Sequence, residues 1–463
     1  MDGGGLRLNM NALDYVLLAL YFVTVLGVGF AARRAIRTSV DFFLSGRSLP
    51  AWVTGLAFVS ANLGALEIIG MAANGAQYGV MTVHYYWIGA VPAMVFLGIV
   101  MMPFYYGSKV RSVPEYLRLR FNRPTHLLNA ITFAVAQVLI AGVNLYALAL
   151  VMQALLGWPL WVAIVVGAAI VLVYITIGGL SGAIYNEVLQ FFVILAGLIP
   201  VTVIGLVKVG GVSGLIALVT VKGLGAPSGD LQYNNAIPLL MRDLLPNGVL
   251  GVAVTGLIAS FMAGMAANVS GFNTVFTYDI WQAYVRRDRP DDYYLRIGRY
   301  ATIAAVVIGI GTAFIAAGFS NIMNYIQALF SVFNAPLFGT FIIGMFWKRM
   351  SALAGFWSLL SGTVVAVGTY LLYKGGVIHF NSDLEESFWG AGLAFATVAV
   401  VAAILTPLTA PERDEDLRGL VYGMGGVDVK GDVLAGDAAW YRSPVLLGVI
   451  ALVLAVVLYI PVF

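Results

Sequence analysis

Long apolar segments recur along the whole of this 463-residue chain, and they constrain its fold more than any other feature. A helix that crosses the hydrocarbon core of a bilayer needs about 20 mostly apolar residues. Segments this long are not barrel strands, which have about 10 residues of alternating polarity. We therefore expect an all-α, polytopic membrane helix bundle with about 12 transmembrane helices, at 12–31, 50–79, 83–104, 126–156, 159–178, 184–207, 248–278, 299–318, 320–346, 351–373, 389–408 and 444–462.

The composition excludes several classes of protein. Hydrophobic residues make up 61% of the chain and charged residues 10%, against about 25% charged in soluble domains. The net charge of +3 is too small for a nucleic-acid-binding surface, so no nucleic acid partner is expected. With no cysteine and three widely separated histidines, no thiolate or clustered metal site is expected.

The positive charges indicate an orientation. Twenty of the 25 Lys and Arg residues lie in alternate loops, among them Arg33, Arg34, Arg37 and Arg47. Because cytoplasmic loops carry the excess of Lys and Arg, we expect an integral protein of the cytoplasmic (inner) membrane with both termini outside. The stretch 409–443 is then the longest inside loop.

The segment 50–79 is interrupted by a polar patch, Ser60-Ala61-Asn62-Leu63-Gly64-Ala65-Leu66-Glu67. Irregular backbone at membrane depth is tolerated where it lines a cavity. Unwound carbonyls can coordinate a cation there, and half-helix ends can face a solute. The alternative is a glycine-containing helix that packs closely.

Two acids lie within apolar segments. Intramembrane acids are costly and usually functional, so Glu67 is a candidate functional residue. The alternative is that Glu67 is a protonated carboxyl group that is hydrogen-bonded inside the bundle. Glu187 is expected near the cytoplasmic interface of the membrane. An acid at that position is explained by its contact with water as well as by a functional role. Segment 248–278 is rich in small residues, which close packing explains.

No catalytic constellation is present at one membrane depth, so we do not expect an enzyme. The stretch Gly178-Gly179-Leu180-Ser181-Gly182 is predicted to be a tight inside turn. It lacks the Lys-Ser/Thr of a phosphate-binding loop. Energy for any transport would therefore come from gradients.

Several motifs resemble the sodium:solute symporter family, the relatives of sodium/glucose cotransporters. They are Asp41-Phe42-Phe43-Leu44-Ser45-Gly46-Arg47-Ser48-Leu49-Pro50, Glu67-Ile68-Ile69-Gly70-Met71, Ser112-Val113-Pro114-Glu115-Tyr116-Leu117-Arg118-Leu119-Arg120-Phe121, Gly178-Gly179-Leu180-Ser181 with Asn186-Glu187-Val188-Leu189-Gln190, Thr274-Val275-Phe276-Thr277-Tyr278-Asp279-Ile280-Trp281, and Phe346-Trp347-Lys348-Arg349. The likeness extends over nearly the whole chain.

The resemblance implies a leucine-transporter-like inverted repeat around a mid-membrane site. Residues 1–49 would hold the leading helix and an inside loop, and 50–207 the first five-helix repeat with its broken helix at 50–79. Residues 248–373 would hold the remainder of the second repeat and a following helix. Residues 374–463 would hold two C-terminal helices and the inside loop 409–443.

The resemblance also implies a cation site. Backbone carbonyls of Ser60, Leu63 and Ser260 match the family's sodium ligands, and Ala263 and Gly264 occupy its two hydroxyl positions. Neither residue has a hydroxyl, although hard cations take oxygen ligands. The implied sodium site is thus degenerate, and no other cofactor is expected.

For the solute, the resemblance implies contacts from four residues. Glu67 stands where glucose relatives have a contacting Gln, Tyr86 stands where they have a Glu, and Gln327 matches a second contacting Gln. Asn62 belongs to the same polar patch. Glu187 stands where the family usually has Asp and is a candidate coupling acid.

One departure from the family is large. Two spans are missing between 184–207 and 248–278, and the intervening connector 208–247 holds a single apolar run, Leu215–Val221, that is too short to cross. We interpret the chain as carrying an internal deletion that leaves the second repeat incomplete. The alternative is a natural short variant with repacked helices.

The sequence therefore favours a secondary active transporter that couples a cation, sodium by resemblance, to a small polar organic solute, sugar-like, by alternating access. Its partners would be the solute, a monovalent cation and the lipid bilayer. In a proton-coupled variant, Glu67 or Glu187 would carry the proton. The alternative from another class is a non-transporting membrane solute-binding or sensory protein, or an inactive truncated transporter.

Overall fold

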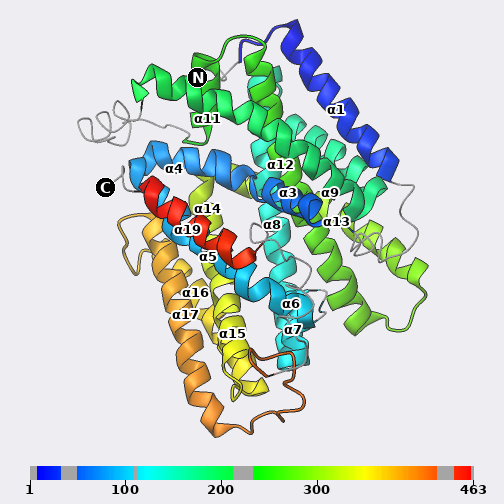
Figure 1. Ribbon diagram of the computed structural model, residues 1–463, viewed down its shortest axis with the longest axis vertical. Coiled ribbons are helices and arrows are strands. Elements are labelled where there is room, and N and C mark those ends of the chain that lie inside the picture. The colour runs from blue at the N-terminus through cyan, green and yellow to red at the C-terminus, as the bar shows by residue number, and fades with distance from the viewer. Residues whose placement is uncertain are drawn as a thin grey trace. The chain divides into compact units, whose positions relative to one another are not determined.

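The computed structural model describes residues 8–32, 49–108, 110, 112–211, 233–424 and 443–459. Within these residues, helices joined by turns and loops make up the structure (Figure 1), which confirms the all-α prediction. Eight helices are long and apolar enough to cross a membrane, or nine when one bent pair is a single span. Three further apolar helices, Trp87–Met101, Leu160–Val173 and Pro444–Leu458, are shorter. The expected number of 12 spans is therefore not confirmed.

Some predicted features lie outside the described residues. They are the basic residues Arg33, Arg34, Arg37 and Arg47, the motif residues 41–48, the apolar run Leu215–Val221, and residues 425–442 of the inside loop.

The chain divides into two compact units, one formed by Met1–Gly79 and Ile131–Ile326 and the other by Val80–Ala130 and Gln327–Phe463. The helices of the first unit are α1 (Ala12–Ala32), α3 (Ala51–Asn62), η3 (Leu66–Gly70), α4 (Met71–Tyr78), most of α8 (Arg123–Leu156), α9 (Leu160–Lys208), η7 (Tyr233–Asn235), α11 (Ala236–Leu244), α12 (Val249–Thr274), η8 (Val275–Val285), α13 (Asp291–Ala317) and the start of α14 (Ile322–Leu329).

Helix α12 is the core of the first unit. It packs against α1, α3, α9 and α13, and its residues from Gly251 to Ala266 are almost all buried. A Cβ on Gly197 of α9 would lie 2.8 Å from the Val252 carbonyl oxygen, and one on Gly256 would lie 3.1 Å from Gly197 Cα. Glycines thus let the two backbones meet, which is the close packing expected of small residues in 248–278.

Helix α1 supplies a cap for α12. The N–H groups of Gly248 and Gly251 donate to Asp14 Oδ1 at 2.7 and 2.8 Å, and Asp14 is fully buried. A carboxylate at a helix N-terminus satisfies N–H groups that have no partner in the helix and meets the positive end of its dipole. The contact therefore fixes α1 against α12.

The predicted inside turn at Gly178–Gly182 is wrong, because α9 continues as helix from Leu160 to Lys208. Each glycine disfavours a helix by about 1 kcal/mol relative to alanine but does not end it, and the proline in this helix comes later, at Pro200. Within this helix, the apolar stretches Leu160–Val173 and Gly182–Lys208 remain two separate candidates for the predicted spans 159–178 and 184–207.

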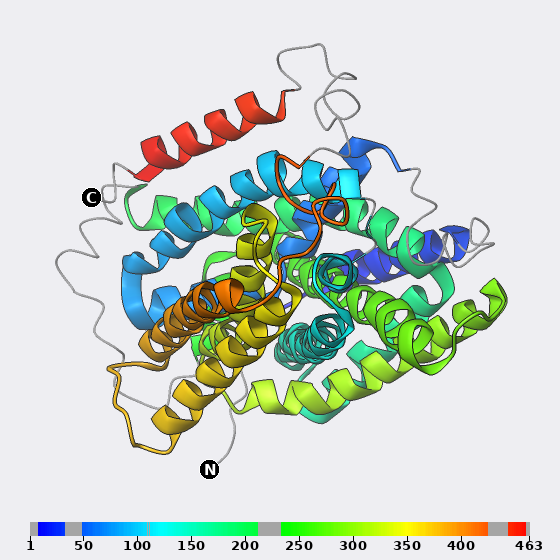
Figure 2. The same ribbon diagram turned by 90° about the horizontal axis from the view of Figure 1, so that it is seen from below.

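The second unit contains η4 (Gly79–Val83), η5 (Tyr85–Ala90), α5 (Val91–Phe96), η6 (Leu97–Met101), α6 (Met102–Ser108), α7 (Val113–Arg120), η9 (Phe330–Asn334), α15 (Ala335–Phe346), α16 (Ala352–Lys374), α17 (Asp383–Leu408) and α19 (Pro444–Tyr459). Helices α15, α16 and α17 pack side by side (Figures 1 and 2). Helix α19 packs against α5.

An arginine joins α7 to the end of α15. Arg120, 1% exposed, donates to the carbonyl oxygens of Gly344 and Trp347 at 2.8 and 3.0 Å. A cation at a helix C-terminus meets the negative end of the dipole and satisfies carbonyls that lack helical partners. Arg120, a residue of one of the motifs that resemble the family, thus has a structural role in the second unit.

Candidate functional site

The first unit contains a broken helix at the polar patch. Helix α3 ends at Asn62, the chain resumes helical structure at Leu66, and the two halves are bent by 49°. Leu63 closes α3 with φ −92° and ψ 53°, and its N–H donates to the carbonyl oxygens of Val59 and Ser60. The interruption expected between Ser60 and Glu67 is therefore present as residues 63–65.

Glu67 stabilises the start of the second half. The Gly64 N–H donates to its Oε2 at 2.9 Å, and the side chain is half-buried in the first turn of η3. N–H groups at a helix start have no partner in the helix, and a carboxylate there satisfies one of them. Glu67 therefore has a local structural role beside the solute contact proposed from the resemblance.

Asn144 of α8 reaches the same break from another helix. The Ala65 N–H donates to Asn144 Oδ1 at 2.9 Å, and the Asn144 amide donates to the Ile140 carbonyl at 3.3 Å. Two side-chain oxygens, from Glu67 and Asn144, thus accept the N–H groups of Gly64 and Ala65. The second half-helix has a capped, fixed N-terminus.

Two glycines make room for Asn144. A Cβ on Gly64 would lie 2.9 Å from Asn144 Oδ1, and a Cβ on Gly264 of α12 would lie 2.6 Å from the same atom. Both distances are below what real Cβ contacts show. The absence of a side chain at Gly264, one of the two family hydroxyl positions, is therefore explained by the Asn144 carboxamide that lies there.

The expected cation ligands meet at the end of α3. The Ser260 hydroxyl of α12 donates to the Leu63 carbonyl. Ser60, whose side chain is also fully buried, has a hydroxyl without a hydrogen-bond partner in the described part of the chain. Ala263 and Gly264 are buried in α12, one turn after Ser260. The helix pair thus brings two serine hydroxyls to the break, although the family hydroxyl positions have none.

Asn62 is engaged within its own helix. Its Nδ2 donates to the Phe58 carbonyl at 2.8 Å, and the residue is exposed. This bond satisfies a carbonyl at the end of α3. Its proposed contact with a solute stays a prediction.

The second half of the broken helix is held by neutral carboxamides. Asn321 Nδ2 donates to Asn74 Oδ1 and Gln77 Oε1, each at 2.7 Å, and the Ile322 N–H donates to Asn234 Oδ1 at 2.9 Å. These bonds connect α4 to the turn between α13 and α14 and connect that turn to η7. They contain no ion pair, so opening them separates no charges.

A second polar group lies on α9. Glu187, Asn186 and Gln190 are 5%, 0% and 1% exposed. Gln190 donates to the Tyr21 hydroxyl at 3.0 Å, and that hydroxyl donates to Met262 Sδ at 3.8 Å, which connects α9, α1 and α12. Glu187 is thus buried within the first unit, and its role as a coupling acid stays a prediction.

The remaining two predicted solute residues belong to the second unit. Gln327 is half-buried in α14 and begins the second of the two segments that form that unit. Tyr86 lies in η5, and its side chain is outside the described residues. Of the predicted residues, the structure therefore brings together Ser60, Leu63 and Ser260, with Glu67 at the same break.

Asn144 was missed from the sequence. It is 5% exposed and stands in a largely apolar run, Ile140-Ala141-Gly142-Val143-Asn144-Leu145-Tyr146. A carboxamide in such a run must find a partner, because burying it without one is costly. That signal marks the residue but not its partner, which lies 79 positions away.

Known proteins resemble this chain over most of its length. The model of the sodium:solute symporter family matches residues 42–222 and 214–362. A sodium/glucose cotransporter of Vibrio parahaemolyticus is 22% identical over 517 aligned positions, which cover 89% of this chain and 93% of that protein. Sodium/glucose cotransporter 1 of Ovis aries is 24% identical over 545 positions, which cover 89% of this chain and 81% of the relative.

A solved structure shares the fold. A sodium-coupled sialic acid symporter, in a substrate-bound outward-open state, aligns with a TM-score of 0.70 at 18% identity, over 87% of this chain and 99% of the other. At that identity the likeness shows the fold alone. It confirms the expected class, a helical membrane bundle of the leucine-transporter-like type.

The match to the family model is split into two segments. The two stretches that match the family model overlap at residues 214–222. The alignment with the Vibrio protein also has 517 positions while it includes 89% of 463 residues, so many of its positions have no residue in this chain. The overlap lies in the connector 208–247, where two spans were expected to be missing.

Proposed function

Because the chain belongs to the sodium:solute symporter family, we propose that it couples the entry of sodium to that of a small polar organic solute by alternating access. The observation that carries this proposal is the break in the first unit. There the Ser260 hydroxyl of α12 donates to the Leu63 carbonyl, and Ser60, three residues earlier in α3, has a buried hydroxyl without a partner in the described part of the chain. Hard cations bind such oxygens.

The two serines offer a reason why sodium remains the proposed ion. The family hydroxyls are replaced by Ala263 and Gly264, but Ser60 and Ser260 bring hydroxyl oxygens to the same junction. In this proposal the Ser260 hydroxyl rotates away from Leu63, and both oxygens then face the ion. The carbonyls of Ser60 and Ser260 complete the set that the family resemblance implies.

For the solute, we propose a carbohydrate or a related polyhydroxylated molecule. The relatives named above are sodium/glucose cotransporters and a sialic acid symporter. Glu67 and Gln327 offer a carboxylate and a carboxamide, groups that hydrogen-bond hydroxyls, and Tyr86 offers a ring. Asn62 is retained as a further contact of the same site.

For the membrane, we propose the orientation given by the positive charges, with both termini outside and the protein in a cytoplasmic membrane. Alternating access would then present the break to the two sides in turn. The hydrogen bonds of α4 to Asn321 join neutral carboxamides, so a movement that opens them would separate no charges.

Uptake into proteoliposomes tests the proposal. Labelled glucose, galactose and sialic acid are offered under an inward sodium gradient, an equal potassium gradient and an equal choline gradient, at one fixed pH. We expect accumulation with sodium alone. Equal accumulation with all three cations would remove sodium as the driver, and accumulation that follows an imposed pH gradient instead would assign the coupling to protons, through Glu67 or Glu187.

A second candidate function follows from the split of the family match into two segments. If two helices of the second repeat are absent, the chain could retain a solute site without the parts that move the solute. Such a protein would bind solute in equilibrium dialysis but would show no counterflow in vesicles. The coding sequence across residues 208–216 checks the premise directly, since two further hydrophobic segments there would mean that the second repeat is complete.

A further inference from the structure

The second unit contains a buried acid that no part of the proposed mechanism uses. Glu386 lies in the first turn of α17 and is 1% exposed. Its Oε2 accepts a hydrogen bond from the Ser387 hydroxyl at 3.3 Å. Its Oε1 has no hydrogen-bond partner among the described residues.

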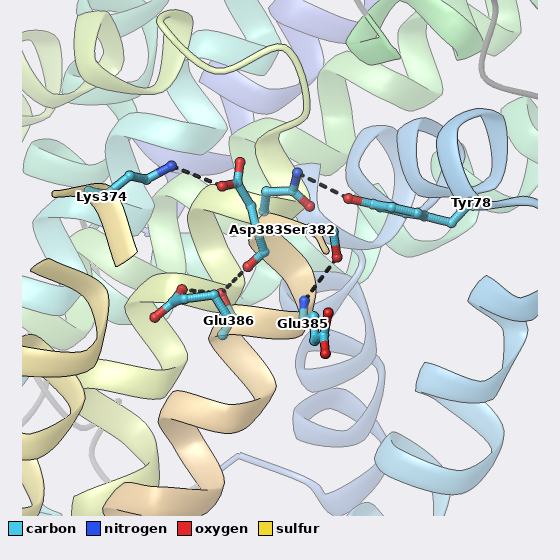
Figure 3. Close-up of polar contacts among 8 residues, drawn as sticks. Tyr78, Lys374, Ser382, Asp383, Glu385 and Glu386 are labelled. Atoms are coloured by element: carbon cyan, nitrogen blue, oxygen red, sulfur yellow. Dashed lines mark hydrogen bonds and ion pairs between the residues drawn. The ribbon is translucent and has the colours of Figure 1, made fainter. Parts of the chain in front are cut away.

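The charged groups around Glu386 are bound to other partners. Lys374, at the end of α16, donates to Asp383 at 2.9 Å (Figure 3). Glu385 accepts from the N–H and the side-chain amide of Asn381, each at 2.8 Å. In the described part of the chain, Glu386 therefore forms no ion pair.

A second unpartnered oxygen comes from η9, which packs against α17. Ser331 is 1% exposed, and its hydroxyl has no partner within the described residues. A Cβ built on Gly390 would lie 3.1 Å from Ser331 Oγ and 3.4 Å from Glu386 Oε1. Both oxygens thus lie beside Gly390, at a position that a side chain there would crowd.

The backbone of η9 adds a further feature. Residues Phe330–Asn334 form a π-helical segment. Such a segment changes the pattern of backbone hydrogen bonds, and π-bulges are frequent at functional sites. The Ser331 hydroxyl that lies near the acid therefore belongs to a segment whose backbone departs from the regular α-helical hydrogen bonding.

A bare carboxylate in this position is costly. Buried charges are paired, coordinate a metal ion, or are neutralised by a proton. We propose that Glu386 and Ser331 form a binding site for a monovalent cation, sodium or a proton, as a second cation site in the second unit. A sodium ion would take the two unpartnered oxygens as ligands, and a proton on Oε1 would be donated to Ser331 Oγ.

The test compares neighbouring variants of the full chain in lipid nanodiscs. E386Q removes the charge with little change in shape. E385Q is the matched control, because Glu385 is one position away and Gln serves equally at this place in the capping box that Ser382 begins. S331A removes the hydroxyl, and G390A places a methyl group close to both oxygens.

The readout is the melting temperature with sodium, potassium or choline at constant ionic strength, and over a pH series without sodium. If sodium is the ligand, it raises the melting temperature of the wild type and E385Q by about 2 °C more than that of E386Q, and S331A and G390A reduce the gain. If a proton is the ligand, rising pH lowers the melting temperature of the wild type and E385Q but not of E386Q.

Equal behaviour of E386Q and E385Q in every condition overturns the site, because the carboxylate of Glu386 would then contribute neither to a sodium response nor to a pH response of the melting temperature. Should E386Q fail to fold, S331A and G390A decide the matter by the same comparison. The readout does not use uptake, so it is independent of whether the chain transports.

Discussion

Glu67 and Glu386 are both acids in the first turn of an apolar helix, but their surroundings differ. Glu67 is half-buried and accepts the Gly64 N–H, while Asn144 accepts the next N–H in the chain. Glu386 is 1% exposed, and one of its oxygens faces an unpartnered hydroxyl. The first acid belongs to a braced site, where Glu67 and Asn144 accept the N–H groups of Gly64 and Ala65. The second belongs to an unbraced site, where the acid forms no ion pair among the described residues.

The comparison indicates that hydrogen bonds to backbone N–H groups can stabilise a partly buried carboxylate in the absence of a ligand. An unpartnered one needs a ligand or a proton to offset the cost of burial. Substitutions at the break should therefore change the melting temperature chiefly through packing. Substitutions near Glu386 should change chiefly how the melting temperature depends on cations.

The largest effect is expected from filling the braced site. Gly264→Ala places a Cβ 2.6 Å from Asn144 Oδ1, and overpacking of this kind destabilises by about 1–3 kcal/mol. Gly390→Ala, whose Cβ would lie 3.1 Å or more from the oxygens it meets, should lower the melting temperature much less. Asn144→Ala removes the obstructing group, so the double variant with Gly264→Ala should recover part of the loss. Equal melting temperatures for Gly264→Ala and Gly390→Ala would contradict the close packing of Asn144 against Gly264.

The next effect separates the cap from the charge of Glu67. Glu67→Gln keeps an oxygen that can accept the Gly64 N–H, whereas Glu67→Ala removes it. Hydrogen bonds to charged groups contribute about 1.5–3 kcal/mol. Glu67→Ala removes such a bond from the start of the second half-helix, so it should lower sodium-driven uptake about tenfold or more. If Glu67→Gln is as inactive as Glu67→Ala although it folds, the charge itself is required, as a solute contact or proton carrier would demand.

A smaller effect is expected at the proposed cation ligands. Ser260→Ala removes a hydroxyl from the break and should raise the sodium concentration for half-maximal uptake by about tenfold, the equivalent of about 1.4 kcal/mol. Thr255→Ala is the control on the same helix, because its hydroxyl donates to the Gly251 carbonyl at 2.7 Å within α12. An unchanged sodium dependence in Ser260→Ala would remove that hydroxyl from the site.

The smallest effect should come from Lys374→Met. Its ion pair with Asp383 is partly exposed, and such pairs contribute about 0–1 kcal/mol. We expect a melting temperature close to that of the wild type and an unchanged difference between E386Q and E385Q. A large loss confined to Lys374→Met would mean that Lys374, and not a bound cation, neutralises Glu386.

The two regions also differ in how well they could be predicted. The break was visible in the sequence because serine, asparagine and glycine interrupt an apolar segment at Ser60–Gly64. The close packing of α12 was visible in its small residues. Both features are local, and local composition is what a single sequence reports.

Long-range partners were not visible. Nothing near Asn144 indicates that it accepts the Ala65 N–H, and nothing near Gly264 indicates that a carboxamide lies where a hydroxyl was expected. Glu386 stands beside Asp383 and Glu385, a group that in sequence is typical of a solvated helix start. The predicted turn at Gly178–Gly182 failed because glycine weakens a helix without ending it.

The central claim is that sodium binds at the break in the first unit. Hydrogen–deuterium exchange of the purified chain, with sodium against potassium at equal ionic strength, tests it at the level of the residues involved. The account predicts slower exchange with sodium in peptides covering residues 60–67 and 258–266, while peptides covering α19, which packs against α5 and away from both proposed sites, serve as the unaffected reference. Identical exchange of residues 60–67 in the two cations, at sodium concentrations that saturate uptake, would contradict it.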